Sequence, residues 1–288
     1  RVYIGQEIES SINISSATPI RLQTIKSKWH NGEVKLAVNN TSNLFSQKLN
    51  WVIPDNGVSQ PYWLKATKST GIYQVNDLLE IGLPEKPYPF ELSVAIEIDG
   101  HPISMTLPLL HGSTDPVKGQ RIQPLIVTPD VMVNIGREVM VYTSNKPKMV
   151  DVEVVAGRPG VEGYVEIFVP TGWKSEPAFY KNSFKDKGEK QVFQFTVTPS
   201  TQMSEGSLRA IFKDDKSVYS MGEYQLKYDH IPELAVFPSA SAKVVRVDLK
   251  KAGEQVGYIM GAGDKVPDAI EEMGYAVTLL TVDDVLQQ

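Results

Sequence analysis

The sequence predicts a mainly β chain, in which two tandem antiparallel β-sandwich (Ig-like) domains are followed by an incomplete α/β (βαβ) unit. The chain has 288 residues, which suits two or three domains of about 100 residues each. Short β-rich runs alternate with turn clusters as far as residue 228, which is typical strand spacing for a sandwich. From residue 255 the pattern changes to strand, turn, helix and strand.

The first sandwich is expected at residues 1–111. Its strand-like runs cover residues 8–14, 20–25, 34–38, 44–53, 71–75 and 92–98. Asp99-Gly100 separates the runs 94–98 and 103–107, and both residues tolerate the positive φ of a tight type I′ turn. We therefore predict a hairpin at this pair.

The second sandwich is expected at residues 125–230, after a polar linker over 112–124 that shows no hydrophobic period. Its β-rich runs cover residues 125–127, 139–142, 149–155, 163–169, 191–198, 207–212 and 223–228. Alternation along residues 191–197 puts Phe193, Phe195 and Val197 on one face, so that face is predicted to be core.

Residues 231–254 are interpreted as a connector that contains a strand at 243–249, and residues 255–288 as the start of an α/β domain. A strand at 256–260 precedes a turn at 261–264, a helix at 265–273 and a strand at 275–280. Asp264 can cap this helix and Gly274 can end it. Parallel strands need neighbours on their edges and cover on both faces. We therefore expect this terminal unit to dock on the second sandwich or on another copy of the chain, with self-association through the 256–280 parallel edge.

Composition limits the classes of partner and site. The chain contains no cysteine, which excludes disulfides, thiolate metal sites and cysteine nucleophiles. A net charge of -5 disfavours nucleic acid as a partner. The sequence has no apolar run of membrane-spanning length, so no membrane span is expected. It opens at Arg1 in strand-like sequence, and we expect a processed or truncated protein.

The sequence predicts no catalytic residue and no metal site. Its four histidines show no metal-ligand spacing, and nucleophile-elbow and phosphate-loop motifs are missing. The adjacent pairs Asp214-Asp215 and Asp283-Asp284 suit turns and helix caps better than acid–base catalysis. Gly261, Gly263 and Asp264 follow a strand and open a helix, where backbone N–H groups could bind an anion or another ligand. The alternative is a tight turn.

Aromatic residues offer a second candidate site. Tyr62, Trp63 and Trp173 could stack on the faces of sugars if their rings lie on a surface. Residues 60–64 are flanked by proline outside any clean alternation, and they are the best candidate for an exposed patch. The alternative is that the aromatics fill sandwich cores, as large apolar side chains usually do.

Several stretches together resemble the downstream region of large bacterial PIG-L/LmbE-like deacetylase proteins. These are Val58-Ser-Gln-Pro-Tyr-Trp-Leu64, Asp115-Pro-Val117, Tyr228-Asp-His-Ile-Pro232 and Gly257-Tyr-Ile-Met-Gly-Ala-Gly-Asp264. The resemblance implies an N-terminal zinc-dependent N-deacetylase domain, similar to those acting on N-acetylglucosaminyl substrates. It also implies that β-sandwich segments and a glutamine-amidotransferase-like α/β domain follow. It favours a periplasmic or secreted location.

No catalytic residue is carried over by this resemblance. The family signature is a His-Pro-Asp-Asp-like run, and neither Asp-Asp pair here has a histidine two residues before it. We therefore expect zinc only in the missing catalytic domain, and no cofactor in this chain. The expected function is that of a non-catalytic accessory region, which spaces or targets that catalytic domain. The alternative is a glycan-binding module that uses exposed aromatics.

Overall fold

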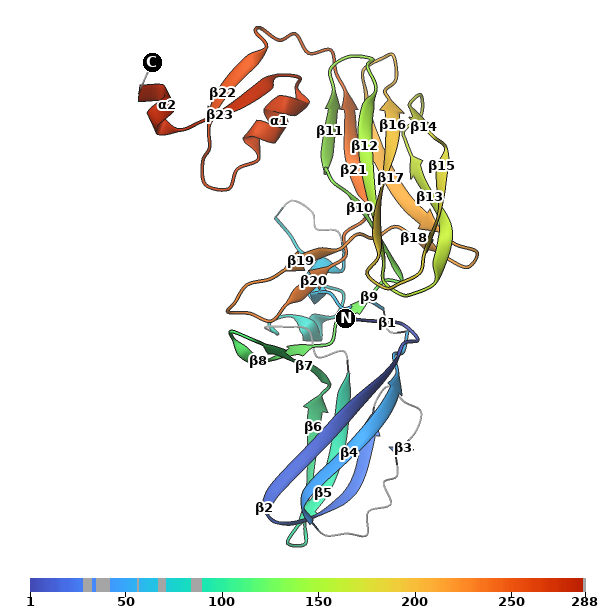
Figure 1. The fold of residues 1–288 in the computed structure, drawn as a ribbon, viewed down its shortest axis with the longest axis vertical. Helices are drawn as coiled ribbons and strands as arrows, with labels where there is room; N and C mark the ends of the chain where they lie inside the picture. The colour runs from blue at the N-terminus through green and yellow to red at the C-terminus, as the bar shows by residue number, and fades with distance from the viewer. Residues whose placement is uncertain (28–32, 35–41, 56, 67–70, 84–89, 287–288) are drawn as a thin grey trace. The chain divides into compact units, whose positions relative to one another are not determined.

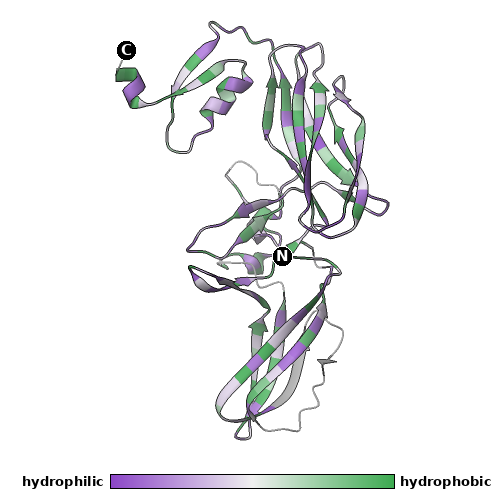
Figure 2. Cartoon of the chain, viewed as in Figure 1, coloured by the Kyte–Doolittle hydropathy of each residue, from purple (hydrophilic) through white to green (hydrophobic). Residues whose placement is uncertain are grey.

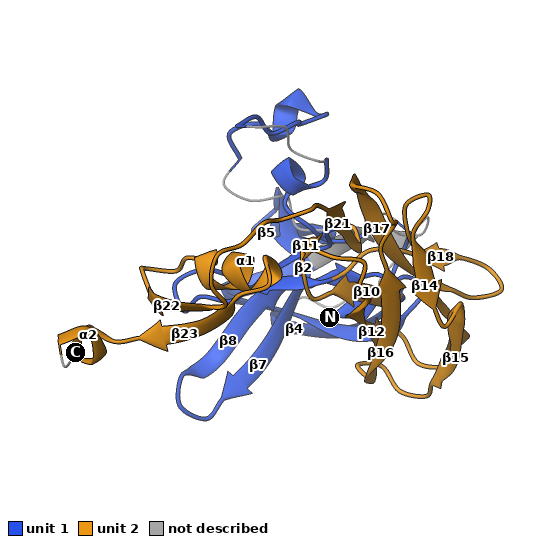
Figure 3. Cartoon of the chain, turned by 90° about the horizontal axis from the view of Figure 1, so that it is seen from above, with its two compact units in different colours: residues 1–130, 223–238 blue, residues 131–222, 239–288 orange. Residues whose placement is uncertain are grey.

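The computed structural model describes residues 1–27, 33–34, 42–55, 57–66, 71–83 and 90–286. The chain is mainly β, and it contains two β-sandwiches and a βαβ unit (Figure 1). Two compact units divide the chain, coloured separately in Figure 3. The first unit contains residues 1–130 and 223–238, and the second contains 131–222 and 239–288. Each unit is therefore built from two separate stretches of sequence.

The first sandwich is organised around one long strand, β2 (Glu7–Ser27). The first half of β2 pairs with β4 (Ser42–Val52) and the second half with β5 (Glu91–Ile98), with a register shift between Ser15 and Ile20. The sheet is completed by β3 (Glu33–Val34) and β6 (His101–Pro108). Residues 71–75 form a turn and a single bridge, not the predicted strand, and 35–38 lie outside the described residues.

The predicted hairpin at Asp99-Gly100 is confirmed. Strands β5 and β6 are joined by this two-residue turn, with Ile98 paired to His101. The φ angles are 49° at Asp99 and 80° at Gly100, which is the left-handed conformation that the turn type requires.

The core of the first sandwich draws on both pairings of β2. Apolar and polar residues alternate along β2 and β4 (Figure 2), so each strand turns one apolar face inward. Side chains from β2, β4 and β5 meet in one cluster: Ile12, Leu49, Trp51, Leu92, Val94 and Ile96. A second cluster joins Val2, Ile53, Phe90, Leu125 and Val127.

The stretch predicted as a linker forms structure of the first unit. Strands β7 (Leu110–Asp115) and β8 (Gly119–Pro124) make a hairpin, which was not expected because both strands are largely exposed and carry no apolar period. The Asp115 carboxylate closes the turn by accepting hydrogen bonds from the backbone N–H groups of Val117 and Lys118, each at 2.8 Å.

The run at 125–127 also belongs to the first unit rather than to the second sandwich. Strand β9 (Val127–Thr128) pairs in parallel with β1 (Val2–Tyr3). Residues 223–238 belong there too, as the hairpin of β19 (Tyr224–Leu226) and β20 (Leu234–Val236). The predicted boundary at residue 230 is therefore replaced by a return of the chain to its first unit.

The second sandwich contains two sheets. One has the order β10 (Val131–Ile135), β12 (Lys148–Ala156), β16 (Lys190–Thr198), β14 (Lys174–Glu176). The other has the order β11 (Val139–Tyr142), β21 (Ser241–Arg246), β17 (Ser204–Lys213), β13 (Val161–Phe168), β15 (Phe179–Phe184), with β18 (Val218–Tyr219) beside β17. The first order matches A-B-E-D of an immunoglobulin domain and the second contains G-F-C, so this sandwich is Ig-like.

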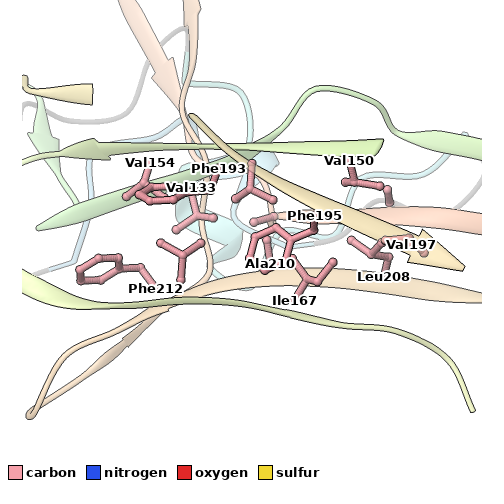
Figure 4. Packing of buried hydrophobic residues seen from close by; sticks show 14 of the residues in the cluster. Val133, Val150, Val154, Ile167, Phe193, Phe195, Val197, Leu208, Ala210 and Phe212 are labelled. Carbon is pink, nitrogen blue, oxygen red and sulfur yellow. The ribbon is translucent and has the colours of Figure 1, made fainter. Parts of the chain in front are cut away.

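The core of this sandwich lies between the two sheets (Figure 4). Figure 4 shows Val133, Val150 and Val154 from one sheet opposite Leu208, Ala210 and Phe212 from the other. The predicted inward face of β16 is confirmed, because Phe193, Phe195 and Val197 are all buried in this cluster.

Strand β21 corrects the expected connector. The sequence placed residues 243–249 between domains, but β21 pairs in parallel with β11 and antiparallel with β17, inside the second sandwich. Val244 is fully buried there. The physical reason is that β21 lies between β11 and β17, and its pairing with both strands joins them into one sheet.

The βαβ unit follows the predicted order. Strand β22 (Gln255–Ile259) pairs in parallel with β23 (Ala276–Leu280), and α1 (Val266–Glu272) connects them. Gly274 has a φ of 91° and ends the helix as predicted. Helix α2 (Val282–Leu286) follows, and Asp284 caps it by accepting the Thr281 backbone N–H at 2.8 Å.

Candidate functional site

Tyr62 and Trp63 do not form the exposed aromatic platform that the sequence suggested. They lie in a single 3-10 turn, η1 (Tyr62–Leu64), where Tyr62 is 8% exposed and Trp63 is half-buried. The Tyr62 hydroxyl donates to the Leu83 carbonyl oxygen at 3.3 Å. The two rings meet edge to face, with centroids 4.8 Å apart and planes at 89°. Because Tyr62 is buried and Trp63 is half-buried, the pair presents no open aromatic platform, so it fits packing better than binding.

Trp173 is a core residue of the second sandwich. It is 6% exposed, and its indole N–H donates to the Ser204 hydroxyl at 3.1 Å. Its ring packs edge to face against Tyr142, with 4.9 Å between centroids. Burial raises the pKa of Tyr142 to about 12. The alternative of core aromatics therefore holds for Trp173.

The turn at residues 261–264 is closed by its own carboxylate. Asp264 accepts hydrogen bonds from the Gly261 backbone N–H at 3.2 Å and from the Tyr258 hydroxyl at 3.0 Å. A Cβ at Gly261 would lie 2.7 Å from the Asp264 carboxylate, and Gly263 has a φ of 71°. The glycines therefore serve a tight turn. An anion approaching this turn would be repelled by the Asp264 carboxylate, which already accepts the hydrogen bond of the Gly261 N–H.

Glu272 is an enclosed carboxylate at the junction of α1 and the second sandwich. It is 9% exposed and lies at the end of α1, where it contacts the second sandwich. Its carboxylate pairs with the Arg137 guanidinium, and at 2.8 Å with the Lys148 ammonium. It also accepts the Val141 backbone N–H at 3.1 Å. Burial, and then the nearby charge of Arg137, lower the pKa of Lys148. The sequence had named docking of this unit on the second sandwich as one of two outcomes, and α1 makes such a contact, while the edges of β22 and β23 take no part in it.

A pocket of about 540 Å³ lies on the outer face of the β13–β15–β17 sheet. It is lined by Tyr164, Glu166, Phe179, Lys213, Asp214 and Asp215. The Tyr164 and Phe179 rings contact each other with centroids 5.3 Å apart and planes at 82°. Phe179 is 53% exposed and Tyr164 is 37% exposed.

Asp214 holds the turn beside this pocket. Its carboxylate accepts the backbone N–H groups of Lys216 at 2.8 Å and Ser217 at 2.7 Å, and the Tyr219 hydroxyl at 3.2 Å. Arg158 lies 3.5 Å away. Burial raises the pKa of Asp214, but these hydrogen bonds and the Arg158 charge outweigh it and lower the pKa overall. The turn role expected for Asp214-Asp215 is confirmed at Asp214.

Sequence reasoning missed Tyr164 and Phe179. Tyr164 lies on the polar side of an alternating strand whose inward residues are Val161, Val165 and Ile167, so an aromatic at this position was a readable signal. Phe179 lies on β15, and no strand was predicted there.

In the stretches that the structure describes, no group of three or more histidine, aspartate or glutamate side chains is placed to hold a metal ion. His30 lies outside those stretches. Among the described helices, none has the length and apolar character needed to cross a membrane.

Comparisons with known proteins identify no family for this chain. No family model matches the chain, and no curated protein matches it. Among solved structures it is similar to a chain in the "Crystal structure of Dpr2 Ig1-Ig2 in complex with DIP-Theta Ig1-Ig3", at 11% sequence identity and a TM-score of 0.23. The match covers 85% of this chain and 60% of that one, so this chain spans less than two thirds of that neighbour's length. At this TM-score we draw nothing from the match, and the Ig-like fold rests on strand order.

Proposed function

We propose that this chain is a non-catalytic accessory β-sandwich region that spaces or targets the zinc-dependent catalytic domain of a PIG-L/LmbE-like N-deacetylase. The four sequence stretches that resemble this family support the link. The observation that carries the accessory role is that the enclosed Glu272 carboxylate makes structural contacts. Glu272 binds Arg137, Lys148 and a backbone N–H of the second sandwich, and so fastens consecutive folded parts together.

Other carboxylates support the same interpretation. Asp264 closes the turn before α1, and Asp214 closes the turn after β17. A catalytic acid or base needs a free proton site within reach of a substrate. These two groups instead accept hydrogen bonds from their own loops, which suits a rigid spacer.

The test measures deacetylation with and without this region. The chain alone, with added zinc, is expected to give no turnover of N-acetylglucosamine conjugates. A PIG-L/LmbE-like catalytic domain linked to this chain is expected to deacetylate a polymeric substrate with higher kcat/KM than the catalytic domain alone, with no change on a monosaccharide substrate. Turnover by this chain alone, or equal kcat/KM with and without it on the polymer, would contradict the proposal.

A further inference from the structure

We propose that the pocket on the outer face of the second sandwich binds a sugar ring of a glycan, with Phe179 and Tyr164 as the aromatic walls. The inference rests on the proposed function in one respect, since it names the ligand class toward which this region would target a catalytic domain. The pocket is a different place from the aromatic turn at Tyr62 and Trp63. It also stands apart from the βαβ unit and its Glu272 contact.

The sheet places the two aromatic rings and the polar groups side by side. Tyr164 and Glu166 share the outward face of β13, because the residue between them, Val165, is fully buried. Glu166 is directly opposite Phe179 on β15, and Tyr164 is directly opposite Lys213 on β17. Neighbouring strands are about 5 Å apart, so these side chains surround one small area of the sheet.

Phe179 and Tyr164 place two neighbouring aromatic rings on the outer face of the sheet, where both are partly exposed. Both side chains come from a sheet whose inner face is filled by its own core. A half-exposed phenylalanine beside a tyrosine leaves apolar surface in water, which has a cost unless a ligand covers it. The nearly perpendicular rings form a corner, and a corner admits one flat apolar face at a time. The apolar C–H face of a pyranose is such a flat face, and it would stack on one of the two rings.

The polar groups of the pocket are available to a ligand. Within the described residues, the side chains of Glu166, Asp215 and Lys213 make no hydrogen bond or ion pair. Two carboxylates can accept from sugar hydroxyls, and the ammonium can donate to them. The volume of about 540 Å³ lies in the usual range of small-ligand sites.

The charges around the pocket nearly balance, because most of its carboxylates lie beside a cation. The Asp214 charge is offset by Arg158, and Glu162 beside the pocket is paired with Lys181 at 2.9 Å. The Glu162 hydrogen bond and charge, and then the charges of Tyr164 and Asp215, raise the pKa of Lys181, so Lys181 remains a cation near the pocket. Lys213 offsets one of the two remaining carboxylates, Glu166 and Asp215, so one net negative charge is left around the pocket. A sugar, which both donates and accepts, matches this mixed set.

The experiment uses the whole chain on an array of neutral and N-acetylated oligosaccharides, followed by calorimetric titration with the best binder and with tetralysine. We expect an oligosaccharide to bind, and Phe179→Ala to weaken it about tenfold or more, as loss of a stacked ring does. Tyr164→Phe, which removes only the hydroxyl, is expected to weaken it less. The matched control is Phe168→Ala, an exposed aromatic on the strand of Tyr164 but outside the pocket, which is expected to leave affinity unchanged.

Three outcomes overturn the inference. These are binding of no oligosaccharide on the array, binding of tetralysine in preference to every oligosaccharide, and equal losses in Phe179→Ala and Phe168→Ala. Thermal unfolding of each variant checks that the fold is retained. If the chain binds a glycan through Phe179 but has no effect on a linked deacetylase, the proposed function fails and the pocket stands. If no glycan binds through Phe179 but a linked deacetylase is still affected, the pocket fails and the proposed function stands.

Discussion

Tyr142 is a buried residue of the second sandwich whose ring and hydroxyl have opposite effects on stability. Its side chain is almost completely buried, and its hydroxyl makes no hydrogen bond within the described residues. The ring packs against Trp173 and lies under the Lys148 ammonium, 5.4 Å from the centroid. A buried hydroxyl without a partner costs about 1–3 kcal/mol of desolvation, so the ring contributes stability while the hydroxyl opposes it.

We predict that Tyr142→Phe leaves the free energy of unfolding unchanged or raises it by about 1 kcal/mol, because it removes only the unpaired hydroxyl. Urea denaturation of the second sandwich measures this. The comparison variant is Trp173→Phe, which loses the bond to Ser204 and part of the core packing and is expected to be destabilised. A clear loss of stability in Tyr142→Phe would show that its hydroxyl has a partner.

Asp214 predicts how stability depends on pH. Its pKa is lower in the folded protein than its ordinary value of 3.8, so the unfolded chain binds a proton more readily. The stabilisation is therefore complete above about pH 5, and it is lost as the pH falls through 3.8 and then through the folded-state pKa. We predict that Asp214→Asn flattens the decline in stability between about pH 5 and pH 2.

The measurement is the urea midpoint at a series of pH values. The matched control is Asp215→Asn, which removes one negative charge from the same turn and leaves the hydrogen bonds of Asp214 in place. If the two variants flatten the decline equally, the effect comes from net charge and not from the Asp214 hydrogen bonds.

At the scale of single residues, sequence patterns succeeded where a local rule applied. The Asp99-Gly100 turn and the Phe193, Phe195 face follow from positive φ and from alternation. The burial of Trp173 could not be decided, because a tryptophan outside a clear strand gives no periodicity. The Tyr164 and Phe179 corner depends on which strands are neighbours, and that is a property of the sheet.

At the scale of elements, prediction failed where exposure or long-range pairing hides the signal. Strands β7 and β8 are polar on both sides, so their sequence reads as a linker. Strand β21 has a clear strand sequence, but its partners β11 and β17 are distant in the chain. The βαβ unit was predicted correctly because its turns, helix and strands are all local.

The Glu272 contact gives the prediction for this scale. Glu272→Gln keeps an acceptor for the Val141 N–H but removes the charge that pairs with Arg137 and Lys148. We expect faster amide hydrogen exchange in α1, with unchanged protection in β12 and β16. Glu271→Gln, the exposed neighbour on the same helix, is the control. Unchanged exchange in α1 would mean that the ion pairs do not hold the helix.

At the scale of the whole molecule, the βαβ unit leaves apolar surface uncovered. Within the described residues, β22 and β23 pair only with each other, and Ile259 and Leu279 are about half-exposed. Unpaired strand edges bind further strands readily. We expect concentration-dependent self-association through the 256–280 edge, measured by sedimentation velocity.

Leu279→Lys is expected to shift this association toward monomer, because a charge on an exposed strand opposes edge pairing. The control is Val117→Lys, which replaces an exposed apolar residue in the β7–β8 turn. Association that is independent of concentration, or equal in both variants, would exclude the edge as the contact.

The return of residues 223–238 to the first unit has a consequence for synthesis. Arg1 forms ion pairs with Glu223 and Glu233, so the first residue of the chain finds these partners only after more than two hundred others have been made. The second sandwich likewise waits for β21. On the ribosome, neither unit can be completed before the other is nearly finished. A cut after residue 130 leaves the first unit without residues 223–238, and a cut after residue 238 separates β21 from the rest of the second unit. A gene designed to express the first unit without the second sandwich must therefore join two distant stretches.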